Sequence, residues 1–275
     1  MARIDRSLAA RLGTQTVALM DAGGYEGPAG WVDLRSRLDA ARDGTCSHPP
    51  DAPIPTAKAT RTTTRYEVRN ETTLQAARRL ADAGLDPVAL NFASAYHPGG
   101  GFRSGSRAQE ESLAWSSGLY HCIVGHPMYA YNEANRSPLY SDWLLYSPAV
   151  PVFREADGAL LAEPYACAFI TAPAVNAKAV LGRDPTRRDE IRQVMGRRID
   201  RVLAAAAHHG HTAIVLGAWG CGAFGNAPED IAAAFRDALG GRHEGRFASV
   251  IFAVIEWRDD ERTIGPFRRA FEPTT

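Results

Sequence analysis

Two glycine-rich stretches hold the residues of this 275-residue chain whose types and spacing are suited to chemistry. The first contains Gly99-Gly100-Gly101 and is followed at short range by Gln109-Glu110-Glu111. The second is Gly220-Cys221-Gly222-Ala223-Phe224-Gly225. Because glycine has no Cβ, such loops let backbone N–H groups approach an anion closely, and the N-terminus of a following helix favours negative charge. The second stretch predicts a phosphate or diphosphate ligand, and the first places two carboxylic acids beside a similar loop.

The second stretch also has the Gly-x-Gly-x-x-Gly spacing of a dinucleotide-binding turn, with a strand-like run at 212–216 before it and a helix-like run at 228–235 after it. Its position argues against a nicotinamide enzyme. A nicotinamide domain opens with this turn and then builds two βαβαβ halves, whereas only one further strand follows here. The acidic residue expected at the end of the next strand is missing, since Glu244 precedes that strand. A diphosphate site is the better interpretation, and a tight turn with structural glycines is the alternative.

Taken together, the two motifs resemble those of a known family. Three successive glycines followed by Gln-Glu-Glu are similar to the signature of poly(ADP-ribose) glycohydrolases. Gly-Cys-Gly-Ala-Phe-Gly looks like the diphosphate-binding loop of that family, with Phe224 as its aromatic residue. The order and separation of the motifs also match, and the resemblance covers about Tyr66 to Phe271. The compact chain is most similar to the short bacterial type, a macrodomain-like core without the large accessory regions of the animal enzymes.

This resemblance implies that the ligand unit is ADP-ribose, and that the reaction is hydrolysis of ribose–ribose O-glycosidic bonds in poly(ADP-ribose) with ADP-ribose as the product. It further implies a role for each residue of the motifs. Gly99, Gly100 and Gly101 would approach the diphosphate and the distal ribose, Gln109 and Glu110 would position ribose hydroxyls, and Glu111 would be the general acid/base. Asn91 stands where family members place an Asp or Asn against the substrate. Gly220, Cys221, Gly222, Ala223, Phe224 and Gly225 would wrap the diphosphate, with the Phe224 ring beside the terminal ribose.

The chemistry of such a bond accounts for a pair of carboxylic acids. A glycosidic bond breaks through an oxocarbenium-like state, which needs a proton for the leaving oxygen and a base for the incoming water. A glutamate that is partly desolvated beside an anionic diphosphate has a raised pKa and can be protonated near neutral pH. We therefore expect neither a metal nor a cofactor, and the Cys/His pattern offers no ligand cluster. His208-His209-Gly210-His211 is ligand-like, but no acidic or Cys partner is near it in sequence, so we interpret it as a solvated helix end.

Other interpretations stay open from the sequence. Adjacent glutamates at a helix start can simply be favourable charges against the helix dipole. A non-catalytic ADP-ribose-binding module would carry the same loops, although the intact Gln-Glu-Glu favours an enzyme, and a NAD-dependent oxidoreductase is the third possibility. His97 can be a second acid/base or a loop histidine that hydrogen-bonds the backbone. Arg187-Arg188 and Arg197-Arg198 are interpreted as a solvated helix face.

Composition limits the partners and the compartment. Lys+Arg and Asp+Glu are equal at 31 each, so the chain lacks the basic excess typical of proteins that bind nucleic acid in bulk. No stretch approaches about 18 consecutive apolar residues, so no membrane span is expected. The 4 cysteines are scattered and suit a reducing cytosol. We expect a cytoplasmic bacterial enzyme whose partners are poly(ADP-ribose) and ADP-ribosylated proteins.

The elements that must position both loops follow from an alternation of strand and helix patterns after residue 60. This order predicts a three-layer α/β/α sandwich with a mixed, mostly parallel central sheet, in which ligands bind beyond the carboxyl ends of the strands. The stretch 126–150 is expected to be a long, Tyr-rich, irregular loop. The expected strands are 64–68, 87–93, 151–154, 165–171, 212–218 and 248–255, and the expected helices are 71–83, 109–124, 184–208, 228–239 and 263–271.

The first 60 residues carry no motif. Ile4, Leu8 and Leu12 recur every four residues and predict an amphipathic helix. The segment 43–60 is rich in Pro and Thr, which is typical of a linker or an ordered arm. We therefore divide the chain into an N-terminal helical extension with a Pro-rich arm packed on the core (1–60) and a macrodomain-like catalytic domain (61–275).

Overall fold

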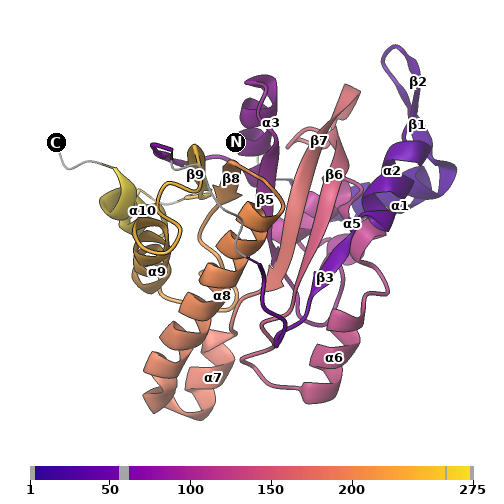
Figure 1. The fold of residues 1–275 in the computed structure, drawn as a ribbon. Coiled ribbons are helices and arrows are strands. Elements are labelled where there is room, and N and C mark those ends of the chain that lie inside the picture. Colours follow the sequence, from indigo (N-terminus) through magenta and orange to yellow (C-terminus); the bar gives the residue numbers. More distant parts are fainter. Residues whose placement is uncertain (1–3, 56–61, 258, 273–275) are drawn as a thin grey trace.

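A central sheet organises the molecule, and a computed structural model describes residues 4–55, 62–257 and 259–272. In this part of the chain the sheet has seven strands in the order β3-β6-β7-β5-β8-β9-β4 (Figure 1). Neighbours from β7 to β4 are parallel, whereas β6 pairs antiparallel with both β7 and β3. The prediction of a mixed, mostly parallel sheet is confirmed. The strands are β3 Cys46–His48, β4 Arg65–Arg69, β5 Pro87–Ala93, β6 Leu144–Arg154, β7 Leu160–Pro173, β8 Ala213–Leu216 and β9 Ser249–Ala253.

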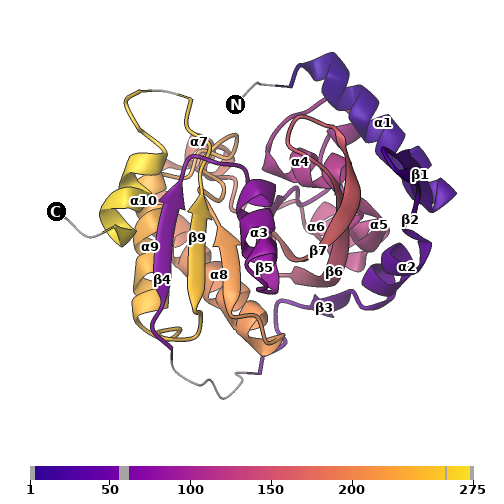
Figure 2. The ribbon, with the colours of Figure 1, turned by 90° about the horizontal axis from the view of Figure 1, so that it is seen from above.

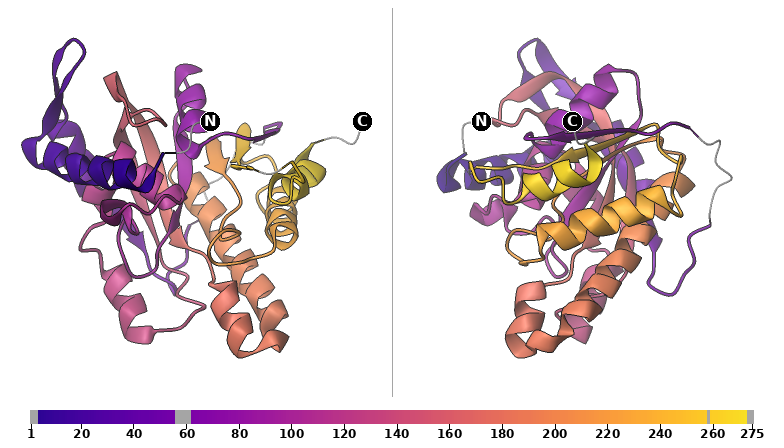
Figure 3. Two further views of the ribbon diagram at one scale, coloured as in Figure 1. Left: turned by 180° about the vertical axis from the view of Figure 1, so that it is seen from behind. Right: turned by 90° about the vertical axis from the view of Figure 1, so that its left-hand side faces the viewer.

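Helices cover both faces of this sheet, which confirms the three-layer α/β/α sandwich. One face carries α7 Ala177–Arg183, α8 Arg188–His208, α9 Pro228–Gly240 and α10 Ile264–Phe271. The other carries α3 Thr73–Asp82, α4 Gln109–Ser116, α5 Leu119–Ile123 and α6 Pro127–Asn135. Figure 3 shows α8, α9 and α10 lying side by side. Within the described residues, no helix is both long and apolar enough to cross a membrane.

The central strand β5 shows how the sequence builds a sheet that is buried on both faces. Side chains of a strand alternate between its faces. Val88 and Leu90 accordingly pack with α8 and α9, whereas Ala89 packs with α3 and α4. Asn91 lies two residues beyond Ala89, on the α4 side, and is 0% exposed. The last part of this apolar strand therefore places the polar side chain of Asn91 beneath α4.

Residues 4–43 pack at one end of the molecule, beside β6 and α4 (Figure 2). They form α1 Arg6–Ala22, a hairpin of β1 Gly24–Gly27 and β2 Gly30–Asp33, and α2 Arg35–Asp43. The predicted amphipathic helix is confirmed as α1, whose N-cap Asp5 accepts a hydrogen bond from the N–H of Leu8 over 2.7 Å. The hairpin and α2 were not predicted from the sequence.

The expectation of an irregular stretch at 126–150 is wrong. Pro127 starts α6 after the N-cap His126, and β6 begins at Leu144. β6 is buried on both faces over most of its length, so it lacks the apolar–polar alternation that would have identified it.

Three further boundaries also differ from the predictions. The helix expected at 109–124 is broken, because Ser117 is extended and bridges Val152 of β6. Asp184 caps a short 3₁₀ turn, and α8 begins only at Arg188. The supposed linker 43–60 contains β3, the edge strand of the main sheet, while its residues 56–60 lie outside the described part. The domain division at residue 60 stays a prediction.

Candidate active site

The two glycine-rich loops lie at the same edge of the sheet. β5 and β8 are parallel neighbours, with Ala89 opposite Val215, and each is followed directly by one of the loops. Beyond their carboxyl ends lies a cavity of about 1170 Å³. Its lining includes Gly100, Gly101, Gln109, Glu110 and Glu111 of the first loop and helix, and Gly220 to Phe224 of the second loop. The fold thus brings together residues more than a hundred positions apart in sequence.

Glu111 is held by backbone donors of the first loop. The N–H of Gly101 donates to its Oε1 over 3.0 Å, and the N–H of Ala108 donates to its Oε2 over 2.8 Å. Gly99 and Gly100 have φ values of +71° and +60°, in the left-handed region that favours glycine. A Cβ on Gly100 would lie 2.3 Å from Glu111 Oε1 and 3.1 Å from Glu110 Oε2. The loop backbone at Gly100 therefore lies directly against both carboxyl groups.

Glu110 also lines the cavity and is 4% exposed. Burial raises its pKa to about 8; the N–H of Ser94, which donates to Oε2 over 2.6 Å, opposes this rise, and the charge of Glu111 adds to it. A carboxyl group with this pKa is mostly protonated at pH 7 and carries one O–H donor. The expected raised pKa beside the diphosphate loop thus applies to Glu110, the residue to which the resemblance assigns ribose positioning.

Asn91 and Gln109 contact the protein more than the cavity. Asn91 Nδ2 donates to Thr171 Oγ1 over 3.2 Å and to Glu110 Oε1 over 3.5 Å, beneath the cavity lining. Gln109 Oε1 accepts from the N–H of Phe92 over 2.9 Å, and its Nε2 donates to Leu90 O over 2.7 Å and to Thr73 Oγ1 over 3.1 Å. The side chain of Gln109 therefore links the start of α4 to the end of β5 by hydrogen bonds.

The base of the second loop is closed by Asn226. Its Nδ2 donates to Val175 O over 2.8 Å and to Gly220 O over 3.1 Å, and its backbone N–H also donates to Gly220 O. Gly220 has φ +75°, and a Cβ there would lie 2.5 Å from Asn226 Nδ2. Gly225, with φ +69°, donates to Gly222 O and completes the turn. The loop is thus shaped by a neutral amide.

The crest of this loop offers backbone donors. Across the described residues, no acceptor is found for the N–H groups of Gly222, Ala223 and Phe224. Cys221 next to them remains a thiol, because burial raises its pKa. α9 begins only at Pro228 and has acidic residues in its first turn, so the backbone N–H groups of the crest, more than the helix end, suit an anion.

An aromatic row joins the two loops. The rings of Tyr96 and Tyr140 meet edge to face at 5.3 Å, and Tyr140 lies 5.8 Å from Phe224. Arg198 of α8 holds the segment that carries Tyr140, since its guanidinium donates to Tyr140 O over 3.0 Å and to Asp142 Oδ1 over 2.8 Å. Arg198 is 2% exposed, so the prediction that it lies on a solvated helix face is wrong.

α1 supports the first loop from behind. A Cβ on Gly13 would lie 2.3 Å from the carbonyl oxygen of Phe102, so the helix contacts the loop backbone directly. Thr16 Oγ1 also donates to Trp115 O of α4 over 2.6 Å. The motif-free N-terminal helix therefore braces both the loop and the helix that carry the carboxyl groups.

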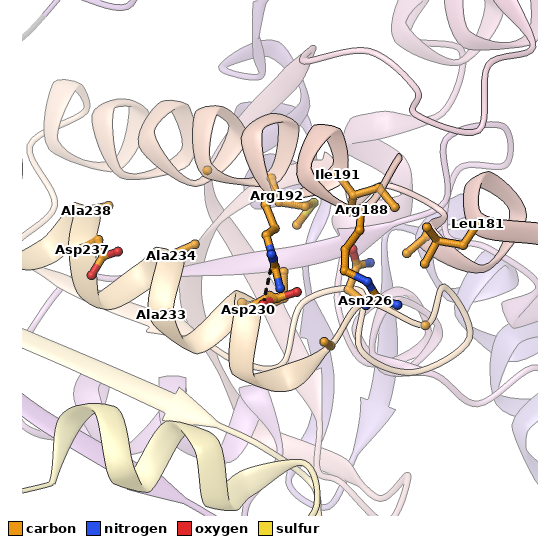
Figure 4. A pocket seen from close by; sticks show the side chains of 16 residues that line it. Leu181, Arg188, Ile191, Arg192, Asn226, Asp230, Ala233, Ala234, Asp237 and Ala238 are labelled. Atoms are coloured by element: carbon orange, nitrogen blue, oxygen red, sulfur yellow. Dashed lines mark ion pairs between the residues drawn. The ribbon is translucent and has the colours of Figure 1, made fainter. Parts of the chain in front are cut away.

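A second cavity, of about 570 Å³, lies between α8 and α9 (Figure 4). Aliphatic side chains such as Leu181 and Ile191 line it, and its Arg192 and Asp230 are paired with each other over 3.1 Å. It touches Gly225 and Asn226 from behind. This second cavity contains no pair of buried acids. We therefore take the cavity between the glycine loops as the candidate active site.

The structure also corrects the expectation that the Cys/His pattern offers no ligand cluster. Cys46, His48 and His209 form one, and it is the only group of at least three His, Cys, Asp or Glu with converging ligand atoms among the described residues. His208-His209-Gly210-His211 is therefore not simply a solvated helix end. None of the three residues lines the candidate active site.

Several supporting residues of the site were not predicted from the sequence. Tyr140 contacts Phe224, Thr171 contacts Asn91 and Gly13 contacts the first loop only through the tertiary fold, whereas Asn226 closes the turn that it directly follows. Asn226 had one visible signal, since an amide side chain directly after a glycine-rich turn is well placed to close it. The other three stand in stretches without any motif.

Comparisons with known proteins show the family to which the fold belongs. The family model for the microbial-type poly(ADP-ribose) glycohydrolase (PARG) catalytic domain matches residues 13–155, a range that begins inside α1. A crystal structure of poly(ADP-ribose) glycohydrolase from Thermomonospora curvata is 46% identical, with 96% of this chain and 99% of that chain covered and a TM-score of 0.91.

Two ligand complexes are similar as well. The Thermomonospora curvata enzyme bound to the inhibitor ADP-HPD is 45% identical over 96% of this chain and 99% of that one, with a TM-score of 0.87. The enzyme from Deinococcus radiodurans in complex with ADP-ribose is 42% identical over 86% of this chain and 97% of that one, with a TM-score of 0.79. A search of curated proteins finds no match.

Proposed function

The chain belongs to the microbial-type poly(ADP-ribose) glycohydrolases, and from this we infer that it hydrolyses ribose–ribose O-glycosidic bonds of poly(ADP-ribose) and releases ADP-ribose. Its substrates are the polymer and the ADP-ribosylated proteins that carry it. The observation that carries this proposal is a cavity lined by two buried carboxyl groups and by a loop whose crest N–H groups have no acceptor within the described part of the chain. Such a cavity combines an anion site with an acid/base pair.

The second loop binds the diphosphate in this proposal. The crest N–H groups of Gly222, Ala223 and Phe224 supply the donors, and Gly220 and Gly225 give the turn its shape. Cys221 completes the crest as a neutral thiol. The Phe224 ring, held against Tyr140, limits where the terminal ribose lies, so that the anomeric carbon faces the carboxyl groups.

The two glutamates take different roles. Residues i and i+1 of a helix point about 100° apart, so Glu110 and Glu111 cannot meet the scissile oxygen equivalently. Glu111, fixed by the N–H groups of Gly101 and Ala108 beside Gly100, is the general acid/base. Glu110, protonated at neutral pH, donates its O–H to a ribose hydroxyl and adds no second negative charge beside the diphosphate.

Asn91 and Gln109 act as positioning residues. Asn91 supports the carboxyl group of Glu110 from below, and Gln109 fixes the start of α4 against β5. Gly99, Gly100 and Gly101 leave room for the substrate to approach the carboxyl groups. The acid/base scheme needs a proton and a water molecule but no metal and no cofactor.

A cytoplasmic location completes the proposal. The free cysteines Cys46, Cys122, Cys167 and Cys221 suit a reducing compartment, where thiols stay unpaired.

The direct test is incubation of the purified chain with labelled poly(ADP-ribose). We expect release of ADP-ribose monomers, with turnover lost in Glu111→Gln. A non-catalytic binding module would retain ADP-ribose in a calorimetric titration yet release none from the polymer. An oxidoreductase would instead bind NAD more tightly than ADP-ribose in the same titration.

A further inference from the structure

β3 and the end of α8 bring three metal-binding side chains together, away from the candidate active site. Cys46 and His48 stand two residues apart on β3, so both side chains point to one face of the strand. His209 directly follows α8, whose end lies beside β3 (Figure 2). Cys46 Sγ is 3.6 Å from His209 Nε2 and 3.9 Å from His48 Nε2, and the two Nε2 atoms are 3.0 Å apart.

These separations approach those of a tetrahedral zinc site. Zn–N bonds of about 2.0–2.1 Å and a Zn–S bond of about 2.3 Å place the two nitrogens about 3.3 Å apart and the sulfur about 3.6 Å from each nitrogen. The three observed separations depart from these values by less than about 0.5 Å. All three residues are partly exposed, so an ion can reach them from solvent.

The cluster is held in place by the surrounding protein. β3 pairs in register with β6, with Cys46 opposite Tyr146 and His48 opposite Leu144. The Tyr146 ring stacks on His209 with centroids 3.6 Å apart and planes 4° apart, which orients the imidazole. Arg201 of α8 donates to the carbonyl oxygens of His48 and Pro49, so it ties the segment after β3 to the helix. The ligands are therefore preorganised.

We propose that Cys46, His48 and His209 bind one Zn²⁺ ion through Sγ and the two Nε2 atoms, with water as the fourth ligand. One thiolate and two imidazoles suit this borderline-soft ion, whereas Mg²⁺ and Ca²⁺ prefer oxygen ligands. His208 is not assigned, because its ring nitrogens do not converge with the ligand atoms of the other three residues. Binding releases the Cys46 thiol proton to solvent.

The ion has a structural role in this proposal. It links β3 to the end of α8, because His48 and His209 are 161 positions apart in sequence. His209 lies on the amino side of β8, whereas the candidate active site lies beyond the carboxyl ends of β5 and β8, and none of the three ligand residues lines its cavity. Zinc therefore raises thermal stability and leaves hydrolysis at ambient temperature unchanged.

The test titrates zinc sulfate into chelator-stripped, full-length protein and counts bound metal after dialysis. We expect one zinc per wild-type chain and a zinc-dependent rise in Tm. In Cys46→Ser, affinity should fall more than about 100-fold, since loss of even outer-shell partners costs about 10–100-fold. Cys122→Ser, which removes a buried thiol outside the cluster, is the matched control and should bind zinc like wild type.

Cobalt substitution identifies the ligand sulfur directly. Wild type and Cys122→Ser should show a thiolate-to-cobalt charge-transfer band with tetrahedral visible absorption, and Cys46→Ser should lack the charge-transfer band. The proposal is overturned if stripped wild type binds no zinc, if binding is weak and without a thiolate band, or if Cys46→Ser binds as tightly as wild type. Hydrolysis by stripped protein is measured in parallel, so failure here stays distinguishable from failure of the glycohydrolase assignment.

Discussion

The two glycine-rich loops share one cavity, yet their glycines make room for different things. A Cβ on Gly100 would lie 2.3 Å from the Glu111 carboxyl group, whereas a Cβ on Gly220 would lie 2.5 Å from the Asn226 amide. At Gly222, a Cβ would meet nothing within 4 Å. The first loop closes around ionisable groups, and the second is tied at its base and open at its crest. The environment beneath each loop thus suits one to proton transfer and the other to anion binding.

The two loops are also held in place by different parts of the protein. α1 and α4 brace the first loop, with backbone contact at Gly13 and a hydrogen bond from Thr16. The second loop is held by Asn226 and by the N–H of Lys178, which donates to Phe224 O over 2.9 Å. We therefore expect changes to the carboxyl groups beside the first loop to affect rate, a side chain added to that loop's backbone to affect both rate and affinity, and changes at the crest of the second loop to affect affinity.

The largest expected effect is that of Glu111→Gln. Glutamine keeps the shape and can still accept from the N–H of Gly101 or Ala108, but it has no proton to transfer. The single-turnover rate of polymer hydrolysis should fall by roughly 10²–10⁴-fold. ADP-ribose affinity should survive, because the change adds no repulsion toward the diphosphate.

Glu110→Gln is the neighbouring control. It should lose less rate, although misplacement of the ribose alone can cost about 10²-fold. If Glu110→Gln is inactive while Glu111→Gln retains most of its rate, the two roles must be exchanged.

Gly100→Val should have the second-largest effect. Its Cβ would displace both carboxyl groups, and a φ of +60° strains a β-branched residue. We expect a rate loss of about 10²-fold or more, weaker ADP-ribose binding, and a stability loss of about 1–3 kcal/mol. Calorimetry and chemical denaturation measure the two effects separately. Wild-type affinity in a folded variant would contradict the placement of this loop against the ligand.

The features of the fold and the site that could be predicted from the sequence are those that depend on a local pattern of residues, and contacts between distant segments could not be predicted. β5 was predicted with its correct bounds, because an apolar run between turn signals is a local pattern. The sequence could single out the loops and the two glutamates as candidates, because the spacing of these residues is a local pattern. β6, buried on both faces, has no alternation, and the bracing of Phe102 by Gly13 is a contact between distant segments.

The cluster of Cys46, His48 and His209 was missed for the same reason. No Cys lies near His209 in sequence, and only the pairing of β3 with β6 beside the end of α8 brings these side chains together. Buried Arg198 is likewise a result of packing that a helix-face pattern cannot show.

The third expected effect is on the pH dependence of stability. It tests whether Glu110, the buried acid beside the first loop, is protonated in the folded protein; the second loop has no such acid at its base, which Asn226 closes. The folded-state pKa of Glu110 is about 8 against an ordinary value of 4.5. Between these values the folded state holds a proton that the unfolded state has released, so the free energy of unfolding falls as pH rises. Wild type should lose stability relative to Glu110→Gln from about pH 5 to pH 8, by at most about 4–5 kcal/mol.

Denaturant unfolding of both proteins at several pH values measures this difference. Comparing the pair cancels the opposite trend of groups such as His209, whose pKa burial lowers to about 4. Parallel curves for the two proteins across this range would show that Glu110 is ionised in the folded state and cannot donate a proton to a ribose hydroxyl.

The smallest expected effect, and the sharpest test of the contrast between the loops, is that of Gly222→Ala. A Cβ at this position meets no protein atom within 4 Å, and Gly222 is not among the glycines with positive φ. Stability should therefore stay within about 0.5 kcal/mol of wild type or rise by up to about 1 kcal/mol, because alanine restricts the unfolded chain. The methyl group instead enters the space from which the diphosphate approaches the crest N–H groups, so the Kd for ADP-ribose should rise several-fold while the single-turnover rate at saturating substrate stays close to wild type. Thermal melts, calorimetry and single-turnover kinetics on one preparation give the three quantities. A variant with unchanged affinity would mean that the crest does not bind the diphosphate, and one with lost rate at saturation would mean that the second loop takes part in chemistry.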